Sequence, residues 1–234
     1  MNKFLINIRV CLFLSIISPT CLALNNEAET IFTTIYEQNA WGSKESVSGP
    51  GSTLKETQKI RQEIPKLLKS YKVKVFLDAP CGDFNWLQHV DLSALDHYIG
   101  IDIVDDLITK NQSHFTDLKK SFFHANILTD VLPKADLIMC RDCLVHFPYE
   151  EIWTALRNFK SSGARYLLTT TFPGCLVNKD IPKVGGWRPL NLEISPFNFP
   201  KPLALITEEI KYTNIVYITK SLALWKLEDL HEVQ

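Results

Sequence analysis

The chain has 234 residues, of which 46% are apolar, and its formal net charge is −1. A chain of this length and composition can bury one substantial core, so we expect a single domain. Its 25 lysines and arginines are scattered among 26 acids and form no stripe that would neutralise phosphates, which excludes a nucleic-acid binder. We expect a small-molecule, glycan or protein partner instead.

Residues 1–23 have the order of a secretory signal peptide. Two basic residues precede a small and apolar stretch over 10–17, Pro19 ends it, and Cys21-Leu22-Ala23 supplies small residues where a signal peptidase reads. The stretch is shorter than the roughly 20 residues that cross a bilayer, unless 4–24 is counted as a whole. We therefore expect export. The alternatives are membrane anchoring through this segment, which would make the membrane a partner, or packing of this segment on the domain.

Two of the six cysteines fall in this leader. The other four are too few for a disulfide framework in a chain of this size. Cys81 and Cys140 are predicted to be small packing residues.

Residues 24–52 precede the predicted sheet and hold Tyr36, Trp41 and a run of turn formers at 46–52. The segment is either a connector or a lid, whose aromatic side chains close over a ligand while the glycines act as hinges. Aromatic residues beside a Gly/Ser loop favour the lid. No Lys-Ser/Thr pair follows the last glycine, so a phosphate-binding P-loop is not predicted.

Apolar runs alternate with helical patterns along 53–230, which indicates one domain with a parallel sheet. A helix should begin at a Thr53/Glu56 capping box, and Pro65 should kink or divide it because its ring removes a backbone donor. A second helix is predicted between Glu150 and Gly163. Strands are predicted at 73–78, 98–102, 121–124, 135–140, 165–171, 203–208 and 221–226.

A Pro-rich excursion follows the strand at 165–171. Loops of this length in compact domains are usually functional or disordered, and aromatic clusters around Trp187 and Phe197 argue against disorder. We predict that the excursion forms one wall of a ligand pocket.

Two strands end in acids at a spacing that suits a nucleotide. The strand at 73–78 ends at Asp78 and runs into a tight turn at Gly82, and twenty positions later a second apolar strand ends at Asp102. In an open parallel sheet, a turn at the end of one strand and an acid at the end of the next can hold a nucleotide and its ribose.

This ordered set of motifs resembles the class I S-adenosylmethionine-dependent methyltransferases over residues 36–226. The resemblance implies an α/β fold with a Rossmann-like doubly wound sheet, mostly parallel with one antiparallel strand near the C-terminus, in the order 3-2-1-4-5-7-6. It also implies S-adenosyl-L-methionine as the cofactor. The family usually places three glycines after the first acid, whereas here Pro80 and Phe84 occupy two of those sites. A nicotinamide dinucleotide, which needs the full glycine pattern, is not predicted.

The resemblance assigns the cofactor's methionine end to Asp78 and the turn after it, and its ribose hydroxyls to Asp102. Ile103 would border the adenine, and Asn126 would replace the acid that often meets the adenine amine, with a local turn cap as the alternative role. The residues assigned to the cofactor are Asp78, Pro80, Cys81, Gly82, Asp102, Ile103, Asn126, Cys140 and Arg141.

Residues 140–147 follow the fourth strand, where the family places residues that face both cofactor and acceptor. Asp142 and His146 are four apart, so on one helical turn Asp142 could orient the imidazole while His146 takes a proton. The alternative is that His146 only packs locally. The acceptor, an oxygen or nitrogen of a small molecule, glycan or protein, would be framed by Tyr36, Trp41, Trp187, Arg188 and Phe197.

Two other functions compete with this one. Cys140-x-x-Cys143 is the spacing of a thiol–disulfide centre, and His146 would extend the pair toward a metal site, although a structural zinc site needs four ligands. A cofactor-binding domain without catalysis would explain the loss of glycines. The sequence indicates no oligomeric state and no metal-dependent transfer. An exported enzyme would have to meet its cytosolic cofactor elsewhere, for example inside a host cell.

Overall fold

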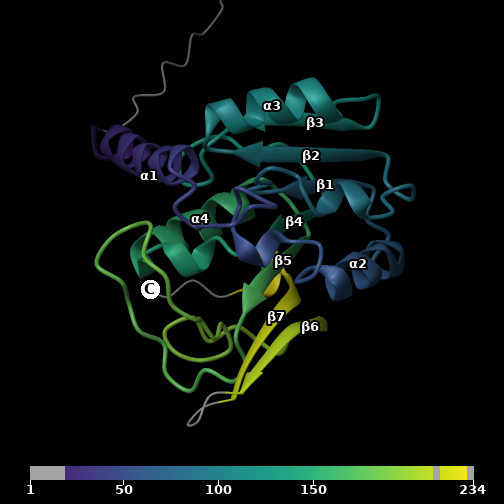
Figure 1. The fold of residues 1–234 in the computed structure, drawn as a ribbon. Helices are drawn as coiled ribbons and strands as arrows, with labels where there is room; N and C mark the ends of the chain where they lie inside the picture. Colours follow the sequence, from purple (N-terminus) through teal and green to yellow (C-terminus); the bar gives the residue numbers. More distant parts are fainter. Residues whose placement is uncertain (1–18, 213–216, 231–234) are drawn as a thin grey trace, which may run out of the picture.

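A seven-stranded sheet forms the centre of the computed structural model, which describes residues 19–212 and 217–230 (Figure 1). The strand order is β3-β2-β1-β4-β5-β7-β6. The strands are β1 (Val75–Asp78), β2 (His97–Asp102), β3 (Lys120–His124), β4 (Leu137–Cys140), β5 (Tyr166–Thr171), β6 (Ala204–Tyr212) and β7 (Tyr217–Lys226).

Parallel pairing joins the first five strands, and β7 runs antiparallel between β5 and β6. The predicted order and the single antiparallel strand are confirmed, and each predicted strand is present with its ends shifted by a few residues. The order reverses between β1 and β4, so a crevice is expected outside the carboxyl ends of these two strands.

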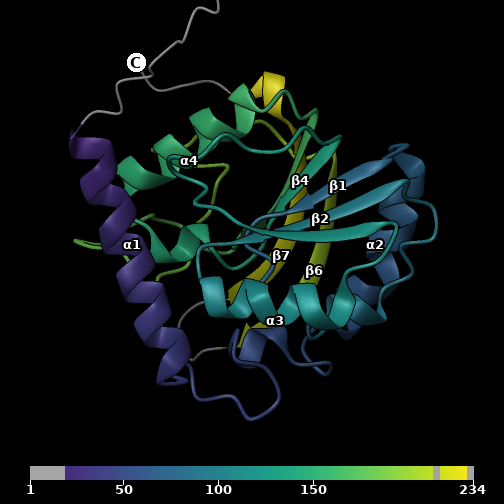
Figure 2. The same ribbon diagram turned by 90° about the horizontal axis from the view of Figure 1, so that it is seen from above.

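Helices cover both faces of the sheet (Figure 2). On one face, α2 (Gln58–Ser70) and α3 (Asp105–Phe115) pack over Phe76, Tyr98 and Phe122. On the other, α4 (Tyr149–Ser161) packs over Leu77, Ile138 and Leu167. Alternate residues of one strand thus enter different cores, as the two-residue repeat of a strand requires, and both faces of the sheet are buried.

Of the two expected effects of Pro65, a kink or a division of the helix, the division does not occur. The helix runs through it from Gln58 to Ser70 because Ile60, Ile64, Leu67 and Leu68 are all buried against the sheet. Tertiary packing of that apolar face outweighs the loss of one backbone hydrogen bond.

The pattern at 53–56 forms a local turn ahead of this helix. The backbone N–H of Glu56 donates to Thr53 Oγ1 (3.4 Å), but α2 itself begins only at Gln58.

Helix α1 (Pro19–Glu37) lies across the carboxyl ends of the parallel strands (Figures 1 and 2). The sequence pattern does not predict it, and its contacts explain its position: Ala28 is buried, and Ile31 and Phe32 pack on the α4 side of the core. Of the predicted signal peptide, residues 1–18 lie outside the described residues and 19–23 form the start of α1. Among the described helices, none is long and apolar enough to span a bilayer.

The excursion at 172–203 has no helix or strand but is well packed. Leu190, Leu192, Phe197 and Phe199 are buried in the core under α4, and Trp225 Nε1 donates to Pro200 O (2.7 Å). Short 3-10 turns complete the fold at Pro50–Ser52, Leu87–His89, Leu144–His146 and Leu227–Asp229.

Candidate active site

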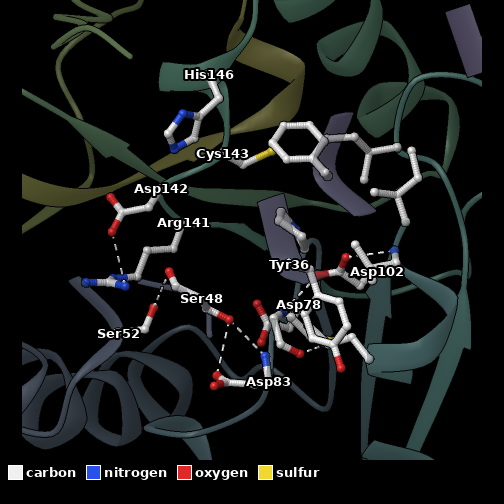
Figure 3. A pocket seen from close by; sticks show the side chains of 18 of the residues that line it. Tyr36, Ser48, Ser52, Asp78, Asp83, Asp102, Arg141, Asp142, Cys143 and His146 are labelled. Atoms are coloured by element: carbon white, nitrogen blue, oxygen red, sulfur yellow. Dashed lines mark hydrogen bonds and ion pairs between the residues drawn. The ribbon is translucent and has the colours of Figure 1, made fainter. Parts of the chain in front are cut away.

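One cavity opens at the carboxyl ends of β1, β2 and β4, beneath α1 and the loop that follows it (Figure 3). Asp78 and Asp102 end their strands there, and the turn between them forms the floor. The wall is completed by side chains from α1, from the loop after it and from the loop after β4. Its lining includes Phe32, Tyr36, Trp41, Val47, Ser48, Ser52, Asp78, Pro80, Cys81, Gly82, Asp83, Trp86, Asp102, Ile103, Val104, Leu107, Asn126, Ile127, Met139, Arg141, Asp142, Cys143, His146 and Phe147.

Asp102 holds the turn after β1 in place. Its Oδ2 accepts the backbone N–H of Gly82 (3.0 Å), and its Oδ1 accepts that of Val104 (3.1 Å). Gly82 has a φ of +56°, and a Cβ there would lie 2.3 Å from Ser48 Oγ, so both the backbone conformation and the space require glycine. Each carboxylate oxygen keeps a further lone pair for a ligand hydroxyl.

Asp78 is a buried acid with little compensation. Its only described hydrogen bond comes from the Tyr98 hydroxyl, which donates to Oδ2 (2.8 Å). Burial raises the pKa of Asp78 to about 8; the Tyr98 hydrogen bond opposes this rise and the neighbouring Asp102 adds to it. The carboxyl group is therefore suited to a cationic ligand group, which would stabilise its ionised form.

The loop after α1 is tied to the turn rather than hanging free. The Asp83 carboxylate accepts the Ser46 hydroxyl (2.9 Å), the Val47 N–H (2.9 Å) and the Ser48 hydroxyl (3.1 Å), and the Asp83 N–H donates to Ser48 Oγ (2.9 Å). On α1, the Tyr36 hydroxyl accepts Lys110 Nζ of α3 (2.6 Å). The segment predicted as a lid thus covers the cavity.

Charged side chains pair behind the loop that follows β4. Glu208 sits at a bulge in β6, between Thr207 and Glu209, and its Oε2 accepts Arg141 Nη2 (2.6 Å). Asp142 pairs with Arg141 Nη1 (3.2 Å) and with Lys220. Burial alone would raise the pKa of Asp142, but the two cations hold it below its usual range.

Asp142 does not orient His146, contrary to the expectation. Asp142 has a left-handed backbone (φ +52°), so residues 142–146 are not one helical turn, and its side chain is held by Thr170 and Lys220. His146 Nδ1 instead lies 2.7 Å from the carbonyl of Gly186 in the excursion. Because a carbonyl only accepts, Nδ1 donates, and in the neutral ring Nε2 carries the lone pair.

The imidazole is held neutral by its surroundings. Burial lowers the pKa of His146, and the Gly186 carbonyl and Asp142 only partly oppose this. The Trp41 ring lies over it with centroids 5.6 Å apart, and Phe32 meets its edge at 6.4 Å. A neutral, fixed imidazole facing the cavity can accept a proton.

Several methyltransferases of known structure have a similar architecture. Magnesium protoporphyrin IX methyltransferase (ChlM) from Synechocystis PCC 6803, with bound SAM, aligns at TM-score 0.52 and 15% identity over 85% of this chain and 97% of that one. Its complex with SAH aligns at TM-score 0.52 and 14% identity over 87% and 98%. The methyltransferase domain of bacterial CtHen1-CN aligns at TM-score 0.52 and 10% identity over 73% and 99%.

The chain has the fold of the class I S-adenosylmethionine-dependent methyltransferases. No protein-family model and no curated protein sequence matches it. At identities of 15% and below, the likeness shows the fold alone, so the chemistry has to be argued from the site.

The methyltransferase fold brings most of the predicted residues to the cavity. Those that line it are Tyr36, Trp41, Asp78, Pro80, Cys81, Gly82, Asp102, Ile103, Asn126, Arg141, Asp142 and His146. Asn126 Oδ1 accepts the Leu128 N–H (2.9 Å), the bond expected of a local turn cap.

Four predicted residues lie elsewhere. Cys140 is fully buried in the core. Phe197 packs against Tyr149 and Trp153 of α4. Arg188 donates to the carbonyls of Leu144 (2.9 Å) and Phe147, and so ties the excursion to the His146 loop. Trp187 lines a neighbouring cavity.

Several lining residues escaped the sequence reasoning. Ser48 and Ser52 belong to the run of turn formers, whose glycines suggested a hinge but whose hydroxyls gave no sign of direction. Asp83 follows Gly82 directly, so its position in the turn was a usable signal. Phe32 was not detectable, because only the packing of α1 brings it to the site.

The cysteine pair has the opposite chemistry to a thiol–disulfide centre. A hydrogen bond with Cys140, together with burial, raises the pKa of the Cys143 thiol well above its usual value, which disfavours the reactive thiolate. Within the described ranges, no cluster of three histidine, cysteine or acidic residues is arranged to hold a metal.

Replacing Asp78 with asparagine should stabilise the ligand-free protein at high pH. The folded protein holds a proton on Asp78 up to a pKa of about 8, whereas the unfolded chain loses it near 4, so this group's contribution makes stability fall as pH rises between the two. In Asp78→Asn that fall is absent. Thermal melts should show a variant more stable by a few kcal/mol at pH 8, with the gap closing toward pH 4. Parallel melting curves at all pH values would contradict the burial argument.

Proposed function

We propose that the protein is an S-adenosylmethionine-dependent methyltransferase. The observation that carries the proposal is that Asp78, Gly82 and Asp102 line a single cavity at the carboxyl ends of β1 and β2, within a methyltransferase fold. Structural neighbours of that fold are crystallised with SAM or SAH.

The residues present fit this cofactor. Asp78 offers an under-compensated carboxyl group to the methionine ammonium, and Asp102 has lone pairs for the two ribose hydroxyls. Apolar side chains of Ile103, Leu107 and Ile127 suit the adenine ring. When bound, the cofactor supplies a methyl group that is already activated for transfer.

The protein's own residues contribute to the reaction by positioning the substrates and by supplying one general base. Side chains of α1 and of the loop after it form one wall of the cavity, and Trp41 packs against His146. His146 Nε2 takes the acceptor's proton, with the ring fixed by the Gly186 carbonyl. The transfer goes to an oxygen or nitrogen of the acceptor, and His146 is needed when that atom is a hydroxyl oxygen.

Cofactor binding tests the core of the proposal. Calorimetry should detect binding of S-adenosylmethionine and of its demethylated product. Asp102→Ala should weaken both by about 1.5–3 kcal/mol, because hydrogen bonds to a charged group are lost. Asp96→Ala, at an exposed acid that precedes β2 and does not line the cavity, is the control and should leave affinity within about threefold. Folded protein that binds neither ligand would contradict both the methyltransferase proposal and the alternative of a cofactor-binding domain without catalysis.

His146→Gln separates catalysis from binding. Glutamine can still donate to the Gly186 carbonyl but cannot take a proton at neutral pH, so cofactor affinity should stay unchanged. Turnover of a hydroxyl acceptor should fall by about 10² to 10⁴, and the acidic limb of the pH–rate profile should disappear. Steady-state rates across pH make the measurement. Unchanged turnover would leave His146 with a structural role and positioning as the source of rate.

We also propose that the mature protein is exported after cleavage near Ala23. The α1 side chains described as packing on the domain or lining the cavity, such as Ala28, Phe32 and Tyr36, lie after that point, so cleavage would keep them in place. The described cysteines Cys81, Cys140, Cys143 and Cys175 are free thiols, which suits action in a reducing compartment where the cofactor is present.

Mass spectrometry of protein from its native source checks the export proposal. The amino terminus should lie near Leu24, and reducing agents should leave the activity unchanged. Soluble protein that retains Met1 would contradict it. Protein that retains Met1 in a membrane fraction would favour the anchored alternative.

A further inference from the structure

A second cavity meets the first at the imidazole of His146. Its lining includes Trp41, Ser48, Pro50, Thr53, Glu56, Asp142, His146, Phe172, Trp187, Glu208 and Lys220. Trp41, Ser48, Asp142 and His146 line both cavities and therefore lie at the boundary between them. A methyl donor in the first cavity and an acceptor in the second would meet at the imidazole, the side chain proposed as the base.

We propose that this second cavity is the acceptor site and that it takes a hydroxyl-bearing ring, aromatic or sugar, that is neutral or cationic. The inference rests on the proposed function. It goes further by naming the place and the chemical class of the acceptor.

The aromatic lining points to a ring. Trp187 is 59% exposed at this cavity, and its indole meets the Phe172 ring edge-on at 6.1 Å. Its two neighbours in sequence are fixed: the Gly186 carbonyl accepts His146 Nδ1, and the Arg188 N–H donates to Val145 O (3.3 Å). An exposed indole on a fixed backbone is a platform on which a planar ring or the C–H face of a sugar can stack at low entropic cost.

The charges in the lining disfavour an acidic acceptor. Three carboxylates line the cavity, those of Glu56, Asp142 and Glu208, and Lys220 is the only cation among its described lining residues. Arg141, behind the lining, pairs with Asp142 and Glu208, so these five groups together carry one net negative charge. Lys220 Nζ already pairs with Asp142 Oδ2 and lies 3.6 Å from Glu208 Oε2. A phosphate or carboxylate on the acceptor would therefore meet net negative charge and no available partner.

The polar atoms of the cavity favour a methyl acceptor that carries a hydrogen-bond donor. His146 uses Nδ1 on Gly186, so Nε2 is left to accept a hydrogen bond. The β6 bulge aims Oε2 of Glu208 at Arg141, and the buried Oε1 has no hydrogen-bond partner among the described residues. Both atoms accept, which matches the O–H of a hydroxylated ring.

Binding of three probes to the protein loaded with S-adenosylhomocysteine tests the inference. Tyramine and 3-(4-hydroxyphenyl)propionate share a phenol and differ only in the charge at the far end, and methyl β-glucoside represents a neutral sugar. Tryptophan fluorescence should show tyramine binding about tenfold tighter than the propionate. Binding of the glucoside with weaker binding of tyramine would assign the site to sugars. Equal or tighter binding of the propionate, or binding of none of the three, would overturn the inference.

The substitution Trp187→Ala tests whether the probe binds in this cavity. It should weaken binding of the favoured ring about five- to tenfold and leave affinity for S-adenosylhomocysteine unchanged. Leu176→Ala is the matched control, because Leu176 is 82% exposed on the same excursion and does not line the cavity. Equal effects of the two substitutions would overturn the assignment. Failure to load S-adenosylhomocysteine at all would instead refute the proposed function.

Discussion

The site depends on one buried carboxylate that is shared between two strands. Asp102 ends β2, but its Oδ2 holds the backbone N–H of Gly82 in the turn after β1. That bond holds the turn at the cavity, where Gly82 has a left-handed backbone and Ser48 leaves no room for a side chain. Asp102 thereby fixes the turn that forms the bottom of the cavity, and Ser48 of the covering loop packs against that turn.

The loop after α1, which covers the cavity, is hydrogen-bonded to the turn after β1. Ser46, Val47 and Ser48 all converge on the Asp83 carboxylate, so a segment that precedes the sheet by thirty residues is fixed to the turn by side chains rather than by strand pairing. Asp78 is the counterpart: it lies beneath this cover with one hydrogen bond, and burial leaves its charge under-compensated. A buried carboxylate of this kind lowers the stability of the ligand-free protein but favours binding of a cation. Functional residues often lower stability in this way.

How far the sequence predicts this structure depends on the range of the forces involved. Strands, their order and the two strand-end acids follow from local patterns, since a buried parallel strand needs a continuous apolar run. The path through Pro65 and the position of α1 do not, because packing against distant elements decides both. The four-residue spacing of Asp142 and His146 wrongly predicted that they share one helical face. Asp142 has a left-handed backbone, so no helical turn connects the two residues, and His146 contacts Gly186 instead. Arg188 was misassigned because its side chain donates to backbone carbonyls, two of which lie more than forty residues away in the chain.

The proposed donor site and the proposed acceptor site differ in the same way: local sequence patterns predict the first, and contacts between distant segments form the second. Residues that would hold the donor come mostly from one stretch, 78–147, where motifs are readable, whereas the second cavity draws on the cover, the excursion and the β6–β7 pair. Bringing two such halves together is the larger part of catalysis: orientation can supply about 7–11 kcal/mol, while a base contributes about 10² to 10⁴ in rate, or roughly 3 to 5 kcal/mol. The contacts that join the halves, Gly186 to His146 and Arg188 to the loop after β4, therefore matter as much as the imidazole itself.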